Sequence, residues 1–349
     1  MVDKDFCISS FLVYRYIIDD QKEFCSNLKH QVYKHIDKSN RVLVSNAKDV
    51  DDYLTYSFKS LKEQQIGILL SGGMDSACLA SYMRGCNAYT FRFCDGEYQK
   101  DELKRAESFA KTYELKLHYV DISWNKITEC LDELMINKGA PVHSIEPQIY
   151  VAAKQAEKDG VKSIVIGDAA DYVFGGMDKL HEKDWEFDEF VKRYTFLDPF
   201  EVLINPVDVY YAFEEFRQGN KIDFIKFMHK YADTESFASY ENAFLSAKVN
   251  YVDPYEPLKM KEPLDLNRIR SGESKYIIRE LFKMKYPQFD IPEKNPMPRP
   301  VDLYFENWDG PKRKEFVKNL DLNRFTGNQK WQLFCLEYFL NLCDKLINK

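Results

Sequence analysis

The middle of the chain alternates short apolar runs with longer stretches in which apolar residues recur at helical spacing. Between residues 66 and 180 the apolar runs predict strands at 66–70, 87–93, 115–121 and 162–167. The stretches between them predict helices at about 75–84, 100–112, 124–137 and 146–159. Strands and helices that alternate in this way are typical of a doubly wound α/β fold with a mostly parallel sheet.

After residue 180 the pattern changes to long aromatic and charged amphipathic stretches, and it predicts no clear strand. We expect a large helical part with helices at 208–218, 221–232, 236–248, 274–285 and 327–346. The proline-rich segment 287–300 excludes both a helix and a central strand, so it either lines the active site or serves as a connector. The first 60 residues are expected to form a helical and extended lead-in that packs on the sheet.

One predicted strand end carries a glycine-rich loop, Ser-Gly-Gly-Met-Asp-Ser, at residues 71–76. Its two glycines let the backbone approach a ligand closely, and the N–H groups of the loop and of the following helix favour an anion such as a phosphate. The loop lacks the lysine of the Walker type, and Asp75 would repel a phosphate unless a cation lay between them. The loop therefore predicts a pyrophosphate site with Mg²⁺.

A second strand end, after 162–167, carries two aspartates within the segment 167–176. If the two strands lie close together in a parallel sheet, Asp75 and Asp171 project at the same edge and could share one Mg²⁺. An alternative is that Asp168 and Asp171 only cap a following helix, which the two glycines at 175–176 would end.

Composition and charge narrow the class of protein. The chain has 349 residues, of which 45% are hydrophobic, enough for a sizeable core. Its net charge of -7 and its scattered basic residues argue against a nucleic acid as the main partner. The eight cysteines include no C-x-x-C pair, which favours reduced thiols, and no run approaches the ~18 apolar residues of a membrane span. We therefore expect a cytoplasmic protein with no membrane partner.

The loop at 71–76 resembles the pyrophosphate loop of the N-type ATP pyrophosphatases, a superfamily that includes asparagine, GMP and NAD synthetases and tRNA-thiolating enzymes. The segment 167–176, Gly-Asp-Ala-Ala-Asp-Tyr-Val-Phe-Gly-Gly, resembles more specifically a segment of the synthetase domain of asparagine synthetases. The likeness covers roughly residues 60–300 and also includes Lys275-Tyr276-Ile277-Ile278-Arg279.

This resemblance implies an adenine nucleotide alpha hydrolase-like fold. The residues 61–180 would form the ATP pyrophosphatase core, and 181–349 would form the helical substrate-pocket part of the same synthetase domain. The lead-in, 1–60, would be a remnant of the region that joins the two domains of the family.

The resemblance also implies roles for individual residues and the use of ATP and Mg²⁺. Asp75 and Asp171 would hold the metal, and ATP and its pyrophosphate would be bound by Ser71, Gly72, Gly73, Asp75, Ser76 and Gly167. Asp168 would be the base or the orienting carboxylate for the nucleophile. Lys294 would stabilise the charge that builds on the leaving pyrophosphate, unless it is a solvated surface lysine.

The chain also departs from the family. Glutamine-dependent asparagine synthetases carry a catalytic N-terminal cysteine and a glutaminase domain, whereas only about 65 residues precede the loop and its strand here. Ammonia would therefore come from solution or from a separate glutaminase, or an amine would replace it. Asp168 stands where the family has a glutamate, and the acceptor pocket differs enough that its ligand need not be aspartate. His143 and Arg299 are candidates for holding a substrate carboxylate or hydroxyl, and a structural hydrogen bond is the alternative for the histidine.

The resulting expectation is an ATP-dependent amide-forming ligase. It would adenylate a small-molecule carboxylate, release pyrophosphate, and transfer ammonia or an amine with loss of AMP. One alternative is a tRNA-modifying enzyme that adenylates a base, against which the acidic net charge and the absence of C-x-x-C argue. Another is a catalytically silent nucleotide-binding scaffold, against which the intact loop and both aspartates argue.

Overall fold

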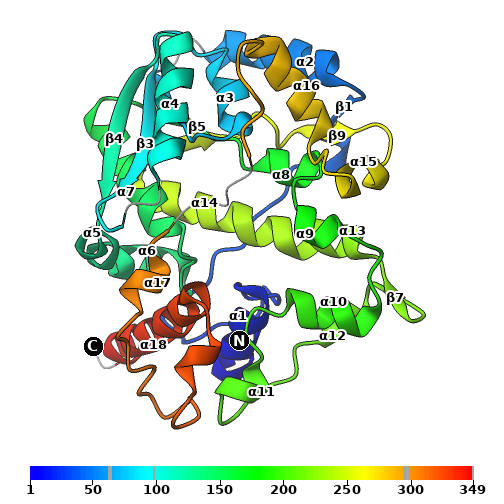
Figure 1. Cartoon of the computed structure of the whole chain (residues 1–349). Helices are drawn as coiled ribbons and strands as arrows, with labels where there is room; N and C mark the ends of the chain where they lie inside the picture. The colour runs from blue at the N-terminus through cyan, green and yellow to red at the C-terminus, as the bar shows by residue number, and fades with distance from the viewer. Residues whose placement is uncertain (62–64, 97–98, 294–296, 298, 348–349) are drawn as a thin grey trace.

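A five-stranded parallel sheet forms the centre of the molecule. The computed structural model describes residues 1–61, 65–96, 99–293, 297 and 299–347. The strand order is β4-β3-β2-β5-β8, and each neighbouring pair is parallel (Figure 1). The strands are β2 (Ile66–Leu69), β3 (Asn87–Phe93), β4 (Lys116–Ile122), β5 (Ser163–Val165) and β8 (Asn250–Val252). The four strands predicted between residues 66 and 167 are confirmed, although β5 is shorter than expected.

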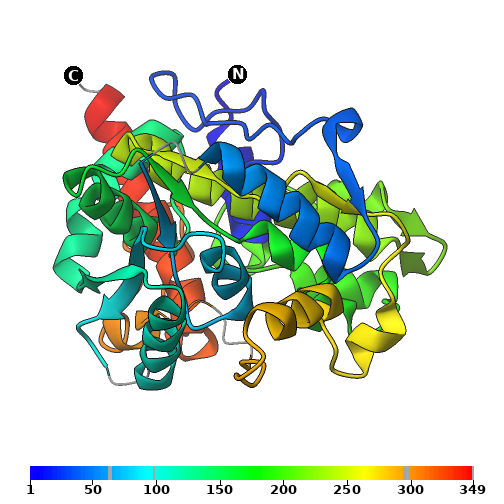
Figure 2. The ribbon, with the colours of Figure 1, turned by 90° about the horizontal axis from the view of Figure 1, so that it is seen from above.

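Helices cover both faces of this sheet because alternate strand residues point to opposite sides. Ile68 and Ala88 belong to one buried core, whereas Leu69 and Tyr89 belong to the other. The first core is covered by α3 (Met74–Ala80), α4 (Lys100–Thr112) and α16 (Tyr276–Lys285), and the second by α7 (Glu146–Lys158) and α14 (Asp233–Ala247) (Figures 1 and 2). The doubly wound fold expected from the alternating pattern is thereby confirmed.

The fifth strand, β8, is supplied by the second half of the chain, so the expectation of no strand after residue 180 is wrong. β8 pairs with β5 in register, Ser163 opposite Asn250. Two further short pairs also involve this half: β6 (Arg217–Gln218) with β7 (Lys221–Ile222), and β9 (Leu258–Met260) with β1 (Val42–Val44). These strands contain only two or three residues each, too few for a period-2 pattern to stand out.

The expected helices of the second half are confirmed only in part. α14, α16 and α18 (Gly327–Ile347) lie close to their predicted positions. The stretches predicted as helices at 208–218 and 221–232 contain instead α12 (Tyr211–Glu214), the β6–β7 hairpin and α13 (Phe224–Phe227), followed by a π-helical turn. Gly219, with φ +65°, makes the tight turn of the hairpin that divides them.

The lead-in is divided between the two parts of the molecule. α2 (Ala47–Leu61) packs on α16 beside the sheet, but α1 (Lys4–Tyr14) contacts α18 and α11 (Pro199–Val202) in the helical layer below it (Figure 1). The expectation that the lead-in packs on the sheet is therefore wrong for α1. This helix is apolar on nearly all sides, and such a helix is stable only when it is enclosed by other elements.

Replacing Phe11 by alanine tests whether α1 is part of the core. Phe11 is 1% exposed, so the substitution should lower the free energy of unfolding by about 3–5 kcal/mol. Urea denaturation followed by circular dichroism measures the change. Tyr56→Ala, at a position 76% exposed on α2, is the control and should change stability by less than about 0.5 kcal/mol. Equal effects of the two substitutions would contradict the placement of α1.

Candidate active site

The Ser-Gly-Gly loop joins β2 to α3 at the carboxyl end of the sheet, and its own side chains close it. The Ser71 hydroxyl lies 3.0 Å from the Ser76 hydroxyl and accepts a hydrogen bond of 3.1 Å from the Gly73 N–H. Gly72 packs on α4 so closely that an added Cβ would lie 2.6 Å from the carbonyl oxygen of Glu102. The first glycine is therefore required by packing, and the N–H groups of Ser71 and Gly73 donate to the two hydroxyls within the loop.

A buried lysine joins the two aspartates that the sequence places at this edge. The Lys275 Nζ lies 2.6 Å from Asp75 Oδ2 and 2.9 Å from Asp171 Oδ1, and its side chain is 3% exposed. Burial alone would lower the pKa of Lys275, but the charges of Asp171 and Asp75 outweigh it and hold the pKa above its usual range. The two carboxylates lie at one edge, as expected, but the cation that they contact in the structure is an ammonium group, and the shared Mg²⁺ stays a prediction.

The second glycine-bearing segment shapes the site around this ion pair. Asp171 belongs to α8 (Ala169–Val173), which starts directly after β5. A Cβ on Gly176 would overlap the Asp171 carboxylate and lie 2.8 Å from Cδ of Lys275, so only glycine fits there. Gly167 lies where a Cβ would come within 3.1 Å of Leu79 on α3. These glycines let β5, α8 and α16 approach one another closely enough for the ion pair to form.

Asp168 is a buried carboxyl group of the site whose protonation depends on its surroundings. It accepts a hydrogen bond of 2.7 Å from the hydroxyl of Ser236 on α14. Burial raises the pKa of Asp168 to about 7, the Ser236 hydrogen bond lowers it, and the nearby charges of Asp171 and Glu235 raise it further. A carboxyl group that titrates near neutral pH can take up and release a proton during a reaction.

A cavity of about 1010 Å³ connects these groups. It is lined by the six residues of the loop and by Gly167, Asp168, Asp171 and Lys275. Pro292, Glu293 and Met297 also line it, so the proline-rich segment contributes to the wall rather than only connecting elements. The cavity has the size expected of a site for a nucleotide together with a second small molecule.

Two arginines of this cavity were not predicted from the sequence. Arg105 of α4 donates from Nε to the Gly72 carbonyl at 3.0 Å, and Arg279 of α16 donates from Nε to the Ser274 carbonyl at 2.7 Å. In both cases the rest of the guanidinium remains near the cavity wall. Arg279 and Lys275 lie in the 275–282 segment that carries the family resemblance, so this resemblance could have indicated that they belong to the site. Arg105 lies on an ordinary amphipathic helix, and nothing in the sequence indicates that it belongs to the site.

The donor set is compatible with Mg²⁺. Asp75 and Asp171 direct oxygen atoms toward one point that already attracts a cation, and oxygen is the ligand that Mg²⁺ prefers. No group of three or more histidines, cysteines or acidic residues that could hold a metal occurs among the described residues. The protein would thus supply two carboxylates, and phosphate and water oxygens would complete the shell, as is usual for this ion.

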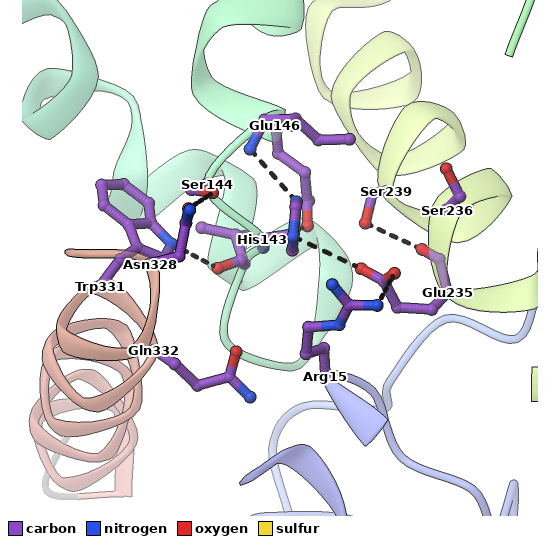
Figure 3. A network of polar contacts seen from close by, with 12 residues as sticks. Arg15, His143, Ser144, Glu146, Glu235, Ser236, Ser239, Asn328, Trp331 and Gln332 are labelled. Atoms are coloured by element: carbon purple, nitrogen blue, oxygen red, sulfur yellow. Dashed lines mark hydrogen bonds and ion pairs between the residues drawn. The ribbon is translucent and has the colours of Figure 1, made fainter. Parts of the chain in front are cut away.

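Two predicted substrate-binding residues lie elsewhere. His143 and Arg299 are not among the residues that line the cavity. His143 is 13% exposed in its side chain, with Nε2 3.9 Å from Glu235 (Figure 3). Burial and the nearby charge of Arg15 lower the pKa of His143 well below its usual range. Arg299 donates to Asn328 at 3.2 Å. Neither residue lines this cavity, and the expectation that they hold a substrate carboxylate or hydroxyl stays a prediction. Lys294 lies outside the described residues.

The family assignment follows from comparison with known proteins. A family model described as asparagine synthase matches residues 50–261. The chain belongs to the asparagine synthase family. A Methanocaldococcus jannaschii protein assigned as a glutamine-hydrolysing asparagine synthetase 1 is 32% identical over 129 residues, a match that covers 34% of this chain and only 22% of that relative. Among the described residues, no helix combines the length and the apolar character needed to cross a membrane.

Two solved structures are similar at low levels. The U34-tRNA thiolase NcsA from Methanococcus maripaludis has a TM-score of 0.34 and 12% identity, with 84% of this chain and 79% of that chain covered. The NMN synthetase from Francisella tularensis has a TM-score of 0.27 and 13% identity, with 71% and 96% covered. Both scores are too low to say anything about function, and the family match and the strand order carry the assignment.

Removing the Lys275 ammonium should destabilise the fold strongly. Lys275→Met leaves two partly exposed carboxylates facing each other without their buried ammonium, which we expect to cost about 2–3 kcal/mol in the free energy of unfolding. Asp75→Asn in the same chain should recover part of the loss, because it removes one of the repelling charges. Urea denaturation measures both effects. Lys179→Met is the matched control, since this exposed lysine lines the same cavity. An equally small effect of both lysine substitutions would refute the structural role of the ion pair.

The raised pKa of Asp168 makes stability depend on pH. Because the folded protein binds this proton more tightly than the unfolded chain, the stability that it contributes is present at low pH and is lost as pH rises to about 7. Relative to Asp168→Asn, the free energy of unfolding should therefore fall by up to about 4 kcal/mol between pH 4 and pH 7, at about 1.4 kcal/mol per pH unit, and then level off. Urea titrations at several pH values measure it. A constant difference between the two proteins would contradict the raised pKa.

Proposed function

We propose that this protein is an ATP-dependent amide-forming ligase that works through an acyl-adenylate. The observation that carries the proposal is the convergence of Asp75, Asp171 and Lys275 beside the Ser-Gly-Gly loop, on a cavity that also contains Asp168. Membership in the asparagine synthase family supports the use of ATP by an amide ligase. The curated relative is matched over only 22% of its length, so its glutamine-hydrolysing activity is not carried over to this chain.

In the first step a substrate carboxylate oxygen attacks the α-phosphorus of ATP, and the bond to the bridging oxygen of the pyrophosphate breaks. The loop N–H groups and the hydroxyls of Ser71 and Ser76 would receive the leaving pyrophosphate. Lys275 lies where its ammonium can stabilise the negative charge that develops on that group. Mg²⁺ held by Asp75 and Asp171 would add further positive charge at the same place.

In the second step ammonia or an amine attacks the carbonyl carbon of the acyl-adenylate, and AMP leaves. The attacking nitrogen must lose a proton, and Asp168 is the carboxyl group best suited to accept it, because its pKa of about 7 lies near the operating pH. The Ser236 hydroxyl fixes the orientation of this carboxyl group. The products are an amide, AMP and pyrophosphate. The nitrogen would come from free ammonia, from ammonia released by a separate glutaminase, or from an amine on a second substrate.

The first test is ATP turnover in a polar metabolite extract with Mg²⁺ and ammonium, with AMP and pyrophosphate resolved from ADP. Wild-type protein should form AMP in an extract-dependent reaction, and Asp75→Asn should lower the rate about 10²-fold or more, because it removes a carboxylate from the pyrophosphate and metal site. Asp101→Asn, at an acid 84% exposed in its side chain on α4, is the control and should leave the rate unchanged.

Formation of ADP instead of AMP, or ATP binding without turnover, would contradict the adenylation mechanism. Turnover that depends on the RNA of the extract and disappears after ribonuclease treatment would favour adenylation of a tRNA base.

A further inference from the structure

Two cysteines from distant parts of the sequence lie next to each other in the helical layer below the sheet. Cys25 belongs to the lead-in, and Cys343 belongs to α18, the helix that contacts α1 in that layer (Figure 1). Both are buried, with 3% and 4% of their surface exposed, and both carry free thiols. Neither cysteine lines the cavity of the candidate active site, so the proposed reaction does not use them.

The neighbours of Cys25 hold it against α18. The ring of Phe24 packs edge-on against Phe339, with 5.0 Å between the ring centres. The side-chain amide of Asn27 donates at 3.1 Å to the backbone carbonyl three residues after Cys343. Phe339 lies four residues before Cys343, and residues at these spacings share one face of a helix. Cys25 lies between the two contacts in sequence and therefore faces Cys343.

The two thiols contact each other directly. A hydrogen bond joins Cys343 to Cys25. The backbone before and after Cys25 is held as well, because Glu23 N–H donates to the Met1 carbonyl at 2.9 Å and an antiparallel bridge joins Cys25 to Leu28. Folding has thus already brought the two sulfur atoms together, and a covalent bond between them would cost little further entropy.

We propose that Cys25 and Cys343 form a disulfide bond when the protein meets a small disulfide such as oxidised glutathione. One cysteine thiolate attacks a sulfur atom of the small disulfide and releases one thiolate from it. The second cysteine then attacks the mixed disulfide and releases the other thiolate. The two protein sulfurs lose two electrons in total, and the small disulfide is reduced to two thiols, which take up the two protons. This inference goes beyond the proposed function and does not depend on it.

The disulfide would join the lead-in to the last helix and close a loop that contains almost the whole chain. A cross-link stabilises a fold mainly by restricting the unfolded chain, and its effect grows with the length of the loop. Gln329, in the first turn of α18, lines the cavity, and Gln332 donates to the Phe11 carbonyl of α1. The bond would therefore reinforce a layer that also forms part of the cavity wall.

Burial controls how fast the bond can form. It raises the pKa of Cys343 above its usual range, and the neighbouring Cys25 raises this pKa further. Because the thiolate is the attacking form, little of Cys343 reacts near neutral pH while the fold is closed. Cys343 lies near the end of α18, where helices open most readily, so a reagent reaches it through local opening. The same burial should slow the reduction of the bond by external thiols.

The first test is a map of the cysteines after oxidation. The protein is incubated with excess oxidised glutathione at about pH 8.5, where thiolates form more readily. The remaining thiols are then alkylated in denaturant, and an unreduced digest is analysed by mass spectrometry. The peptide that contains Cys25 should be joined to the one that contains Cys343, at a mass two hydrogen atoms below their sum. Free thiols or glutathione adducts in place of this link, or a bond from either residue to another cysteine, would overturn the inference.

Thermal unfolding is an independent measurement of the same bond. Oxidation should raise the Tm of the wild-type protein by about 5–8 °C relative to its reduced form. Cys343→Ser should abolish this rise. Cys7→Ser, at another buried cysteine of the helical layer, is the matched control and should keep it. Each variant is compared with its own reduced form, so that any loss of stability caused by the substitution cancels.

A rise of the same size in Cys343→Ser and in the wild-type protein would overturn the inference, since the stabilisation would then come from another site. No rise in the wild-type protein would also overturn it.

Discussion

The active site depends on a single buried ammonium group held between two carboxylates. Asp75 begins the helix after β2, Asp171 lies in the helix after β5, and Lys275 precedes α16, so three segments far apart in sequence meet at one point. Without the ammonium the two acids would repel each other at the edge of a parallel sheet, where helix starts and the loop already leave little room. The absence of a side chain at Gly176 lets Asp171 and Lys275 come together, whereas Gly72 lets the loop pack on α4.

In the proposed function, the same ion pair would serve both the free and the nucleotide-bound protein. When no phosphate is present, Lys275 balances the two carboxylates and the site carries a net charge near -1. In the proposed function, bound phosphates and a divalent cation would give the carboxylates a second positive partner, and the ammonium would then be able to turn toward the phosphate oxygens. The pKa of Asp168 is set first by burial and by the Ser236 hydrogen bond, and the charges of Asp171 and Asp75 also raise it.

Topology made part of the site predictable from the sequence. Parallel strands that alternate with helices place their carboxyl ends at one edge, so the convergence of Asp75 and Asp171 followed from the order of the elements. The role of Lys275 did not follow, because it lies about one hundred residues beyond Asp171 and no period or spacing connects it to the sheet. β8 was missed because a three-residue strand gives no alternation. The enclosure of His143 beside α14 could not be predicted, because a sequence does not show which other segments will pack around a histidine.

The buried contacts of Glu146, which is labelled in Figure 3, also determine which way α14 is turned about its own axis. Glu146 is fully buried and accepts hydrogen bonds from the backbone of His143 and from Asn242 of α14, at 2.7 and 2.6 Å. Asn242 lies two helical turns after Glu235, on the same side of the helix. The hydrogen bond between Glu146 and Asn242 therefore fixes which side of α14 faces the cavity. It thereby also fixes the direction from which the Ser236 hydroxyl donates to Asp168. A residue that does not line the cavity thus helps to set the orientation of the carboxyl group that we propose as the proton acceptor.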